Sequence, residues 1–587
     1  MNLNTANINS LWASLLVDEL IRQGVTYFCI SPGSRSTPLT AAVAGNSEAK
    51  PFIHFDERGA AYHALGYARA TGRPAALICT SGTAVANYLP AVVEASMSGL
   101  PMILLTADRP PELHDTGANQ TITQPGIYSH YVRHEVNMPC PDTSIKAEFV
   151  LTTIDDAVHH ARRSPAGPVH INCMFREPLA PVETGEDFDD YIEPLASWRK
   201  SRSPFTTYSP THVSAASRDI DAVADILKQT LKGVLVVGRL KTRADADAAL
   251  RLSRKLGWPT LPDIMSGLRL GVDEKQLIHC YDRLLASERF HVKRRPSVCL
   301  HLGGQVISRR LEDYLHVDKP QHYIMINSDP RRLDAGHQVT MRLESDIPAF
   351  CEQLIERLDD KQPDEWLEGF QNGAATVNRI VDDILAKQTY LSEPTVARVI
   401  SENIPATSGL FLASSLPIRE MDVFASTEGK RVDLSANRGA SGIDGTIASA
   451  VGYAVGANKP VTLFIGDLAF LHDLNSLAMV KKAPAAVTIV VINNNGGNIF
   501  SFLPIAQHHD IFEQFFVTPH NLHFENAAAM FGLQYNKVDN ATAFTDTYVK
   551  AVSGTKSSIM EVTVDRHHTS DTHRAVADAI RNHPGPW

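Results

Sequence analysis

The sequence has no continuous run of 18 or more apolar residues, and no basic residues precede the apolar stretch of its N-terminus, MNLNTANINSLWASLL. We therefore expect neither a membrane-spanning helix nor a secretory signal. Cysteine is also scarce: the seven cysteines are odd in number, scattered along the chain, and form no CxxC pair. This pattern predicts reduced core cysteines in a cytoplasmic protein rather than a disulfide framework.

Long blocks of like charge are missing as well. The net charge is −10, but residues of both signs are spread along the chain. Neither nucleic acid nor an anionic membrane surface is therefore an expected partner, and small molecules are favoured. The sequence also lacks a GxGxxG motif after a strand, a GxxxxGK[ST] motif and an HExxH motif. The alternative of a non-catalytic nucleotide-binding or regulatory protein therefore has little support, and we assign no catalytic role to the 24 histidines.

Apolar strands alternating with helical stretches dominate what is present, in a chain of 587 residues that is 44% hydrophobic. Strands such as VTYFCI, AALIC, GVLVVG, VTLFIGD and AAVTIVVIN are apolar throughout. Such strands, alternating with helices, predict parallel sheets covered on both faces. We expect an α/β fold of three doubly wound domains, at residues 1–185, 205–356 and 385–587. A linker rich in Pro, Ser and acids (about 180–212) and a charged, largely helical connector (about 357–390) separate them.

Polar residues gather where these strands end. In the first domain they form SPGSRS at 31–36, DER at 56–58, TSGT at 80–83 and ADR at 107–109. In the third domain they include Gly466-Asp467 and the run Asn493 to Gly497. Each motif alone is explained by a turn or a helix cap. Together they favour a ligand site, because loops and helix N-termini converge at the carboxyl ends of parallel strands.

A divalent metal site is predicted in the third domain. Asp467 and Asn494 follow two strands that are expected to be neighbours in a parallel sheet. A carboxylate, an amide oxygen and a backbone carbonyl such as that of Gly496 are the hard oxygen ligands that Mg²⁺ prefers. Helix N-termini nearby offer N–H donors to phosphate.

The spacing of Gly-Asp and Asn-Asn resembles the thiamine diphosphate fingerprint, although Leu468 stands where many members carry glycine. Longer stretches are similar to one branch of that superfamily, the 2-succinyl-5-enolpyruvyl-6-hydroxy-3-cyclohexene-1-carboxylate synthases of menaquinone biosynthesis. These stretches are SPGSRSTPL, HFDERG, CTSGTAVANYLPAVVEAS, LTADRPPELHDTGANQTI, SANRGASGIDG and VINNNGGNIFSFLP. The resemblance covers essentially the whole chain. It implies a thiamine diphosphate-binding fold with an N-terminal pyrimidine-binding domain, a central domain, and a C-terminal domain for diphosphate and metal.

The resemblance implies thiamine diphosphate and Mg²⁺ (or Mn²⁺) as cofactors. It further implies decarboxylation of 2-oxoglutarate and 1,4-addition of the resulting succinyl carbanion to isochorismate. The alternative is another thiamine diphosphate-dependent 2-oxoacid decarboxylase or carboligase, such as acetohydroxyacid synthase. The number of arginines near strand ends argues against that alternative, because pyruvate-using sites need fewer cations to bind carboxylates.

Individual roles also follow from the resemblance. Glu57 is expected to hydrogen-bond the cofactor's pyrimidine from the end of a buried strand. Ile443, next to Gly442, is expected to be the apolar wedge beneath the cofactor, with ordinary core packing as the alternative. The residues expected to hold the diphosphate and metal are Asp467, Leu468, Asn494 and Gly496.

A second set is expected at the substrates. Around isochorismate or the reacting centre we expect Ser34, Arg35, Arg109, Asn119, Gln120, Arg309 and Arg310; near the part derived from 2-oxoglutarate we expect Ser415, Arg419 and Arg438. The expected catalytic residues are Glu57, Gln120, Arg35, Arg309 and Arg310. Arg309 departs from the family pattern, which often has lysine there. Phe500 and Leu503 are expected to form an apolar wall, or else to pack in the core.

The expected assembly is a homodimer or homotetramer. Glu57 and Asp467 fall in different predicted domains, and in the superfamily the two halves of the site come from different subunits. We therefore expect the free monomer to be inactive.

Overall fold

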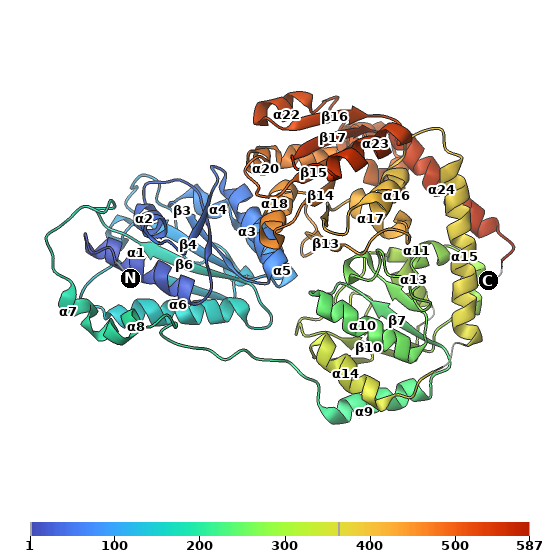
Figure 1. Ribbon diagram of the computed structural model, residues 1–587, viewed down its shortest axis with the longest axis horizontal. Coiled ribbons are helices and arrows are strands. Elements are labelled where there is room, and N and C mark those ends of the chain that lie inside the picture. Colours follow the sequence, from blue (N-terminus) through green and yellow to red (C-terminus); the bar gives the residue numbers. More distant parts are fainter. Residues whose placement is uncertain (1–2, 318, 362–363, 586–587) are drawn as a thin grey trace. The chain divides into compact units, whose positions relative to one another are not determined.

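The computed structural model describes residues 3–317, 319–361 and 364–585. It contains three sheets, and the strand pairs in each are parallel (Figure 1). Helices alternate with the strands along the chain. The predicted α/β fold with three parallel sheets is therefore confirmed.

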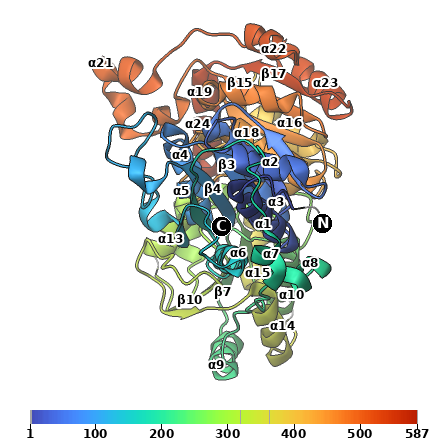
Figure 2. The same ribbon diagram turned by 90° about the vertical axis from the view of Figure 1, so that its left-hand side faces the viewer.

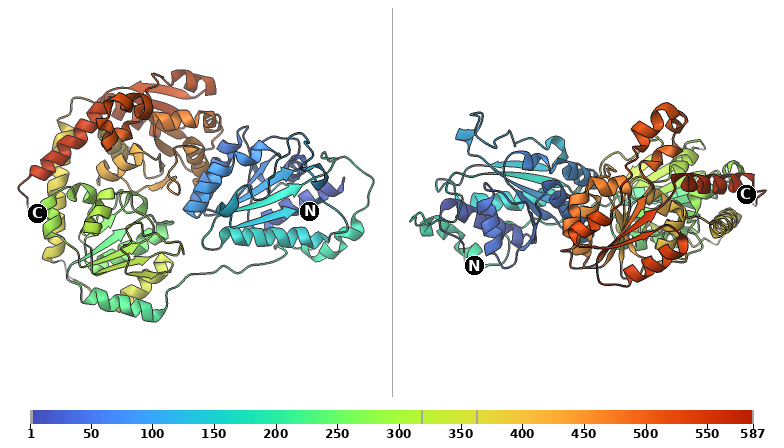
Figure 3. Two further views of the ribbon diagram at one scale, coloured as in Figure 1. Left: turned by 180° about the vertical axis from the view of Figure 1, so that it is seen from behind. Right: turned by 90° about the horizontal axis from the view of Figure 1, so that it is seen from above.

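The first sheet has the strand order β2-β1-β3-β4-β6-β5. Its strands are β1 (Tyr27–Ile30), β2 (Lys50–Ile53), β3 (Ala75–Cys79), β4 (Met102–Asp108), β5 (His134–Met138) and β6 (Pro168–Met174). The helices around it are α1 (Ile8–Arg22), α2 (Thr37–Gly45), α3 (Glu57–Thr71), α4 (Thr83–Ala86), α5 (Leu89–Ser98) and α6 (Ala147–Arg162). Helices cover both faces of the sheet, which is why the central strands are apolar on both sides (Figure 3).

The strand before Glu57 corrects one expectation. We predicted a buried strand, but β2 is the outermost strand of its sheet and its residues are largely exposed. Ile53 is 54% exposed and Phe55 is 63% exposed. We predicted burial because the strand is apolar. An edge strand has a neighbour on one side only, and the sequence pattern does not reveal which strand lies at the edge.

The predicted linker is also partly wrong. Residues 189–200 form the short helices α7 (Asp189–Ile192), η3 (Glu193–Leu195) and α8 (Ala196–Lys200). Leu195 and Trp198 are buried in the same core as α1, and Trp198 Nε1 donates to Glu19 Oε2 at 2.6 Å. Residues 175–188 and 201–216 lack helix and strand, so these short helices interrupt the predicted linker.

The second sheet has the order β11-β10-β9-β7-β8. Its strands are β7 (Gly233–Val237), β8 (Thr260–Pro262), β9 (Val298–Leu302), β10 (His322–Ile326) and β11 (Met341–Leu343). Its helices are α9 (Ser217–Lys228), α10 (Arg243–Leu256), α11 (Tyr281–Leu284), α12 (Glu288–Lys293), α13 (Arg309–Val317) and α14 (Ile347–Arg357). The expected helical connector is α15 (Glu365–Ala386), which buries Trp366 and Phe370.

The third sheet has the order β13-β12-β14-β15-β17-β16. Its strands are β12 (Gly409–Leu412), β13 (Asp433–Ala436), β14 (Val461–Gly466), β15 (Val487–Asn493), β16 (Gln534–Val538) and β17 (Ser558–Thr563). Its longer helices are α16 (Glu393–Asn403), α17 (Leu416–Phe424), α18 (Thr446–Ala457), α23 (Ala541–Val552) and α24 (Arg566–Asn582); shorter ones are α19 (Asp467–His472), α20 (Leu477–Val480), α21 (His509–Phe512) and α22 (Glu525–Phe531). Because β14 and β15 are neighbours, the residues that follow them meet at one edge of the sheet, as predicted.

The chain forms two compact units. The first consists of Met1–Thr211, Asn437–Val461 and Ala469–Val487, and the second of His212–Ala436, Thr462–Leu468 and Thr488–Trp587. Within the first unit α18 packs against α3 (Figures 1 and 2). The contact is close because both helices carry glycine there: a Cβ on Gly66 would lie 2.0 Å from Ser449 O. The segment after β13 therefore belongs to the same unit as Glu57.

Two composition-based expectations can be compared with the structure. All seven cysteines are buried and free, as predicted. Within the described ranges, no helix combines the length and the apolar character that crossing a bilayer requires.

Candidate cofactor and substrate site

Asp467 lies buried at the end of β14, where it begins α19. Its Oδ2 atom accepts a hydrogen bond from Gly496 N at 2.9 Å and lies 3.1 Å from His520 Nε2; its Oδ1 accepts from Leu468 N at 2.7 Å. Burial raises the pKa of Asp467, while the hydrogen bonds from His520 and Gly496 oppose that rise. The structure thus brings together Asp467, Leu468 and Gly496.

Asn494 reaches the same edge from β15. Its Nδ2 donates to Glu393 Oε1 at 2.9 Å, and Asn498 Nδ2 donates to the same oxygen at 2.9 Å. The Oδ1 atoms of both asparagines are buried and have no hydrogen-bond partner among the described residues. Unsatisfied buried acceptors are costly unless a ligand supplies the missing interaction.

The backbone conformation at position 496 requires glycine. Its φ is +136°, and a Cβ there would lie 2.1 Å from Val517 O. Only glycine tolerates both the conformation and the close approach. The fixed backbone holds the Gly496 N–H on Asp467 Oδ2.

These residues fit a divalent metal. A buried carboxylate and a nearby amide oxygen without a partner in the described chain are the donor types that Mg²⁺ binds. Asp467, Asn494 and the Gly496 carbonyl are thus suited to hold the ion, and their role as its ligands stays a prediction.

Three residues of this region were missed. Glu393 is the first residue of α16 and lies 101 positions from Asn494, so no local motif connects them. Asn498 lies within VINNNGGNIFSFLP, but we predicted no role for it from sequence. His520 contacts Asp467, although we predicted no role for the histidines. Apart from the residue type itself, nothing in the sequence points to this contact.

Glu57 begins α3, and Asp56 caps that helix by accepting from Arg58 N at 3.0 Å. Glu57 is half-buried rather than buried. Its Oε2 lies 3.4 Å from Asn87 Nδ2, at the long limit of a hydrogen bond. The Glu57 carboxylate therefore makes only this weak side-chain hydrogen bond within the described chain, which leaves it available for the expected ligand contact.

The loops after β1 and β3 pack against each other. Arg35 N donates to Thr80 Oγ1 at 3.3 Å, and a Cβ on Gly33 would lie 2.3 Å from Thr80 Cβ. Gln120, from the long loop after β4, joins them: its Nε2 donates to Ser81 O at 2.9 Å. Gln124, which we did not predict, anchors this loop by accepting from Gly82 N at 3.0 Å. The structure thus brings together the regions of Arg35 and Gln120.

The remaining predicted residues of these loops differ in exposure. Ser34 and Asn119 are exposed, and Arg109 is half-buried with its Nε lacking a partner among the described residues. Arg35 is 5% exposed; its Nη1 donates to Phe175 O at 2.9 Å and its Nη2 lies 3.4 Å from Glu177 Oε1. The Arg35 guanidinium is thus already engaged by its own chain.

Arg309 and Arg310 begin α13 in the second unit. The Arg309 side chain is 80% exposed and pairs along its own helix with Glu312 and Asp313 at 3.6 and 3.0 Å. Arg310 instead lies 2.6 Å from Asp282, which is buried and also accepts from Ser308 Oγ at 2.7 Å. Arg309 is therefore exposed and paired within its own helix, whereas Arg310 contacts a buried carboxylate of another helix.

Ser415 and Arg419 lie together at the start of α17. Ser415 has a φ of +74°, and Arg419 Nη1 donates to Ser415 O at 2.6 Å. Burial lowers the pKa of Arg419. The pair belongs to the second unit, whereas Arg438, its expected companion, belongs to the first.

Gly442 lines a cavity of about 320 Å³ in the first unit, together with Tyr62, Glu94 and Asp444. The turn beside it is fixed because Glu94 accepts from Gly439 N and Ala440 N at 2.8 and 2.7 Å. Ile443 is only half-buried, so ordinary core packing does not account for it.

Phe500 and Leu503 lie in the segment that leads to α21, which stands away from the third sheet (Figure 2). Leu503 is 47% exposed, which excludes core packing for it. Phe500 is half-buried and contacts Phe516 edge-on, with ring centroids 5.6 Å apart.

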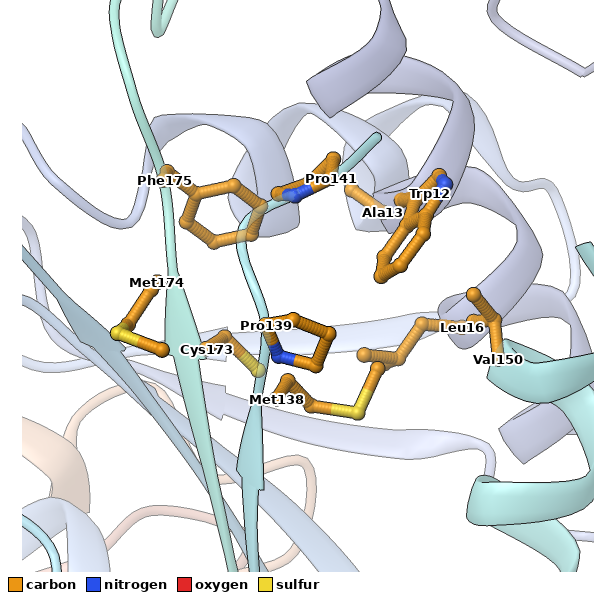
Figure 4. Close-up of a pocket in the computed structure, with 10 residues that line it drawn as sticks. All are labelled: Trp12, Ala13, Leu16, Met138, Pro139, Pro141, Val150, Cys173, Met174 and Phe175. Atoms are coloured by element: carbon orange, nitrogen blue, oxygen red, sulfur yellow. The ribbon is translucent and has the colours of Figure 1, made fainter. Parts of the chain in front are cut away.

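Two other features do not suit the expected ligands. The pocket in Figure 4 is apolar, lined by residues such as Trp12, Met138 and Phe175, and its volume of about 10 Å³ holds no more than a water. His134, Asp156 and His160 lie within ligand distance of one another. However, the two imidazoles are stacked with centroids 4.5 Å apart and planes 14° apart, so an ion within bonding distance of both rings cannot lie in both ring planes.

Comparisons with known proteins agree with this arrangement. Residues 12–127 match the N-terminal TPP binding domain of thiamine pyrophosphate enzymes, residues 189–412 the middle domain, and residues 425–562 the C-terminal TPP binding domain. The chain is 47% identical to a 2-succinyl-5-enolpyruvyl-6-hydroxy-3-cyclohexene-1-carboxylate synthase of Rubrobacter xylanophilus, covering 97% of this chain and 98% of the relative. It is 44% identical to the synthase of the same name from Salinibacter ruber, covering 97% and 96%.

The chain belongs to the 2-succinyl-5-enolpyruvyl-6-hydroxy-3-cyclohexene-1-carboxylate synthase family. It is therefore a thiamine diphosphate-dependent enzyme of the carboligase type. The fold is also that of a solved structure described as a thiamin diphosphate-dependent enzyme from Mycobacterium smegmatis. The two are 17% identical, with a TM-score of 0.71 over 94% of this chain and 99% of the other.

Proposed function

We propose that the protein joins 2-oxoglutarate to isochorismate. The bond between C1 and C2 of 2-oxoglutarate breaks and releases CO₂, and the remaining four-carbon unit adds to the isochorismate ring in a 1,4 sense. The product is 2-succinyl-5-enolpyruvyl-6-hydroxy-3-cyclohexene-1-carboxylate, an intermediate of menaquinone biosynthesis. The observation that carries the proposal is the Asp467–Asn494–Gly496 cluster in a chain 47% identical, over 97% of its length, to a synthase of this name.

The C-terminal residues hold the metal in this proposal. Asp467, Asn494 and the Gly496 carbonyl bind Mg²⁺ or Mn²⁺, and Leu468 lines the diphosphate end. The bound cofactor supplies the carbon nucleophile, while the protein orients it and sets its surroundings. Glu57 hydrogen-bonds the pyrimidine ring, and Gly442 and Ile443 support the cofactor from below.

The substrate residues are proposed to recognise carboxylates. Arginine forks pair with carboxylates in bidentate fashion, which suits two dicarboxylic substrates. Isochorismate is proposed to contact Ser34, Arg35, Arg109, Asn119, Gln120, Arg309 and Arg310. The part derived from 2-oxoglutarate is proposed to contact Ser415, Arg419 and Arg438, with Phe500 and Leu503 as an apolar wall.

The test is a complete reaction and its omissions. Purified protein with thiamine diphosphate, Mg²⁺, 2-oxoglutarate and isochorismate should consume isochorismate and release CO₂, and omission of any component should stop consumption. Isochorismate that persists in the complete mixture overturns the proposal. Replacing 2-oxoglutarate by pyruvate tests the alternative acetohydroxyacid synthase type of activity, for which product should form without isochorismate.

The proposed assembly is a homodimer, or a homotetramer built from it, in the cytoplasm, with pyrimidine-, central and diphosphate-binding domains at 1–185, 205–356 and 385–587. Glu57 and Asp467 of one site would then come from different subunits. Mixing inactive Glu57→Gln and Asp467→Ala proteins under subunit exchange should restore about a quarter of the activity, because half of the dimers contain one intact site. If both residues of a site came from one subunit, mixing would restore nothing.

A further inference from the structure

Glu393 holds two asparagine amides in one orientation. Its Oε1 atom accepts from Nδ2 of Asn494 and from Nδ2 of Asn498, each at 2.9 Å. An amide carries its N–H₂ on one side and its oxygen on the other. Because both N–H₂ groups face Glu393, both Oδ1 atoms are turned away from it.

The two amide oxygens are acceptors without a donor in the described part of the chain. Both are buried, and neither has a hydrogen-bond partner there. An acceptor in this state can bind a cation or a water hydrogen. If either amide were rotated by 180°, it would present N–H₂ instead, which repels a metal ion.

Glu393 itself is unusual in its surroundings. It is 1% exposed at the start of α16, and in the part of the chain that the structure describes its side-chain hydrogen bonds go to amides and not to a lysine or arginine. Its backbone N is held by Thr569 Oγ1 at 3.3 Å, so its position on the third domain is fixed. A buried carboxylate without a paired cation is costly, and its contact with two amides at the metal edge suggests a reason to keep it.

We propose that Glu393 is a positioning residue for the metal end of the cofactor site. It fixes the Asn494 amide so that the oxygen, and not the N–H₂, is available to the divalent metal, and it holds Asn498 in the same way. This inference rests on the proposed function, because it takes the metal of the cofactor as the ligand. It assigns roles to two residues for which we predicted none from sequence.

The first test separates hydrogen bonding from charge. Glu393→Gln keeps an acceptor oxygen but loses the charge, whereas Glu393→Met loses both at similar length. The dissociation constant of Mg²⁺ is measured by calorimetry on metal-free protein saturated with thiamine diphosphate, without substrates. We expect Glu393→Met to weaken Mg²⁺ binding by about 10–100-fold and Glu393→Gln by much less. At saturating Mg²⁺ most of kcat should return, because the variant loses affinity for Mg²⁺ and not the ability to turn over substrate.

The matched control is Glu402→Gln, on the exposed part of the same helix, which should leave Mg²⁺ binding unchanged. Circular dichroism and the thermal midpoint of the metal-free proteins report folding. If Glu393→Met does not fold, Glu393→Ala takes its place, because the space it opens admits water to the amides.

The second test is a rescue. In the double variant Glu393→Met with Asn494→Asp, residue 494 carries oxygen on both sides, so its orientation no longer matters. Mg²⁺ affinity should return to within a few-fold of the wild type. A role of Glu393 in packing alone predicts no rescue.

Three results would overturn the inference: unchanged Mg²⁺ affinity in a folded Met or Ala variant, equal losses in the Gln and Met variants, or no rescue by Asn494→Asp. Failure of the proposed function gives a different result. Wild-type protein that binds Mg²⁺ with thiamine diphosphate but consumes no isochorismate refutes the function and leaves the positioning role standing.

Discussion

The metal end of the cofactor site and the arginines expected at the substrates differ in how far the chain has arranged them. At the proposed metal end, Asp467 accepts hydrogen bonds from Leu468 N and Gly496 N and lies 3.1 Å from His520 Nε2. The Asn494 side chain is held there with its Oδ1 lacking a partner among the described residues. At least three of the six arginines are instead engaged by their own chain in the described residues: Arg35 with Phe175 O, Arg310 with Asp282, and Arg419 with Ser415 O. The proposed metal end is thus arranged before any ligand binds, whereas arginines that bind substrate must share or exchange their present partners.

The physical reason lies in the chemistry of the two groups. A divalent metal requires several oxygens within about 2.0–2.6 Å of one point, so its ligands must be fixed in advance. An arginine has five N–H donors on a long side chain and can keep one partner while it binds another. The following predictions test this difference, beginning with the largest expected effect.

Asp467→Ala should abolish turnover. It removes the proposed metal ligand and leaves the Gly496 N–H and His520 without their partner. Because changes to residues that merely support ligands cost about 10–100-fold in metal affinity, loss of a ligand should cost more than about 100-fold. Calorimetry with Mg²⁺ and thiamine diphosphate measures this. Asp546→Ala, an exposed change on α23, is the control, and normal Mg²⁺ binding by Asp467→Ala would refute the assigned ligand.

Glu57→Gln should lower kcat by about 10²–10⁴-fold, the usual range for groups that assist proton transfer, because it weakens the hydrogen bond proposed to the cofactor's pyrimidine. The folded state should be preserved, because the side-chain hydrogen bond that Glu57 makes within the described chain is the long one with Asn87. Steady-state turnover and the thermal midpoint are measured together, with exposed Glu48→Gln as the control. Full activity in Glu57→Gln would remove the role assigned to this carboxylate.

The stability of the metal-free protein should decrease as the pH rises from about 4.5 to 8. Burial raises the pKa of Glu420 to about 8, whereas an unfolded glutamate has its usual lower pKa. The native state therefore binds the extra proton in this window, and its stabilising effect is present below the unfolded pKa and lost as the pH passes the folded one. Glu420→Gln should reduce this slope in denaturant unfolding measured at several pH values. An identical slope in the variant would show that Glu420 is not responsible.

Arg309→Lys should have the smallest effect. The side chain is 80% exposed and its partners Glu312 and Asp313 lie on its own helix, so exposed pairing contributes little. We expect less than a few-fold change in the KM for isochorismate, and a larger one for Arg310→Lys, which breaks the contact with buried Asp282. Equal effects of the two changes would show that exposure does not distinguish these arginines.

The sequence supplied much of the metal end because its residues follow strand ends at regular positions. Apolar strands that alternate with helices predict a parallel sheet, and neighbouring parallel strands deliver Asp467 and Asn494 to one edge. Glu393 and His520 were missed because they reach the same edge from other elements, 101 and 53 positions away from their partners. Burial of β2 was predicted wrongly because periodicity describes a strand but not its place in the sheet.

By itself, the sequence determined the α/β class, the three parallel sheets, the family and the strand-end residues of the proposed metal site. These features depend on local patterning and on motifs close together in the chain. Only the tertiary structure decided that β2 lies at an edge, that residues 189–198 complete the first core, and that Glu393 faces two amides. The reason is that burial and hydrogen-bond partners depend on which elements pack together, and packing joins residues whose separation along the chain has no fixed pattern.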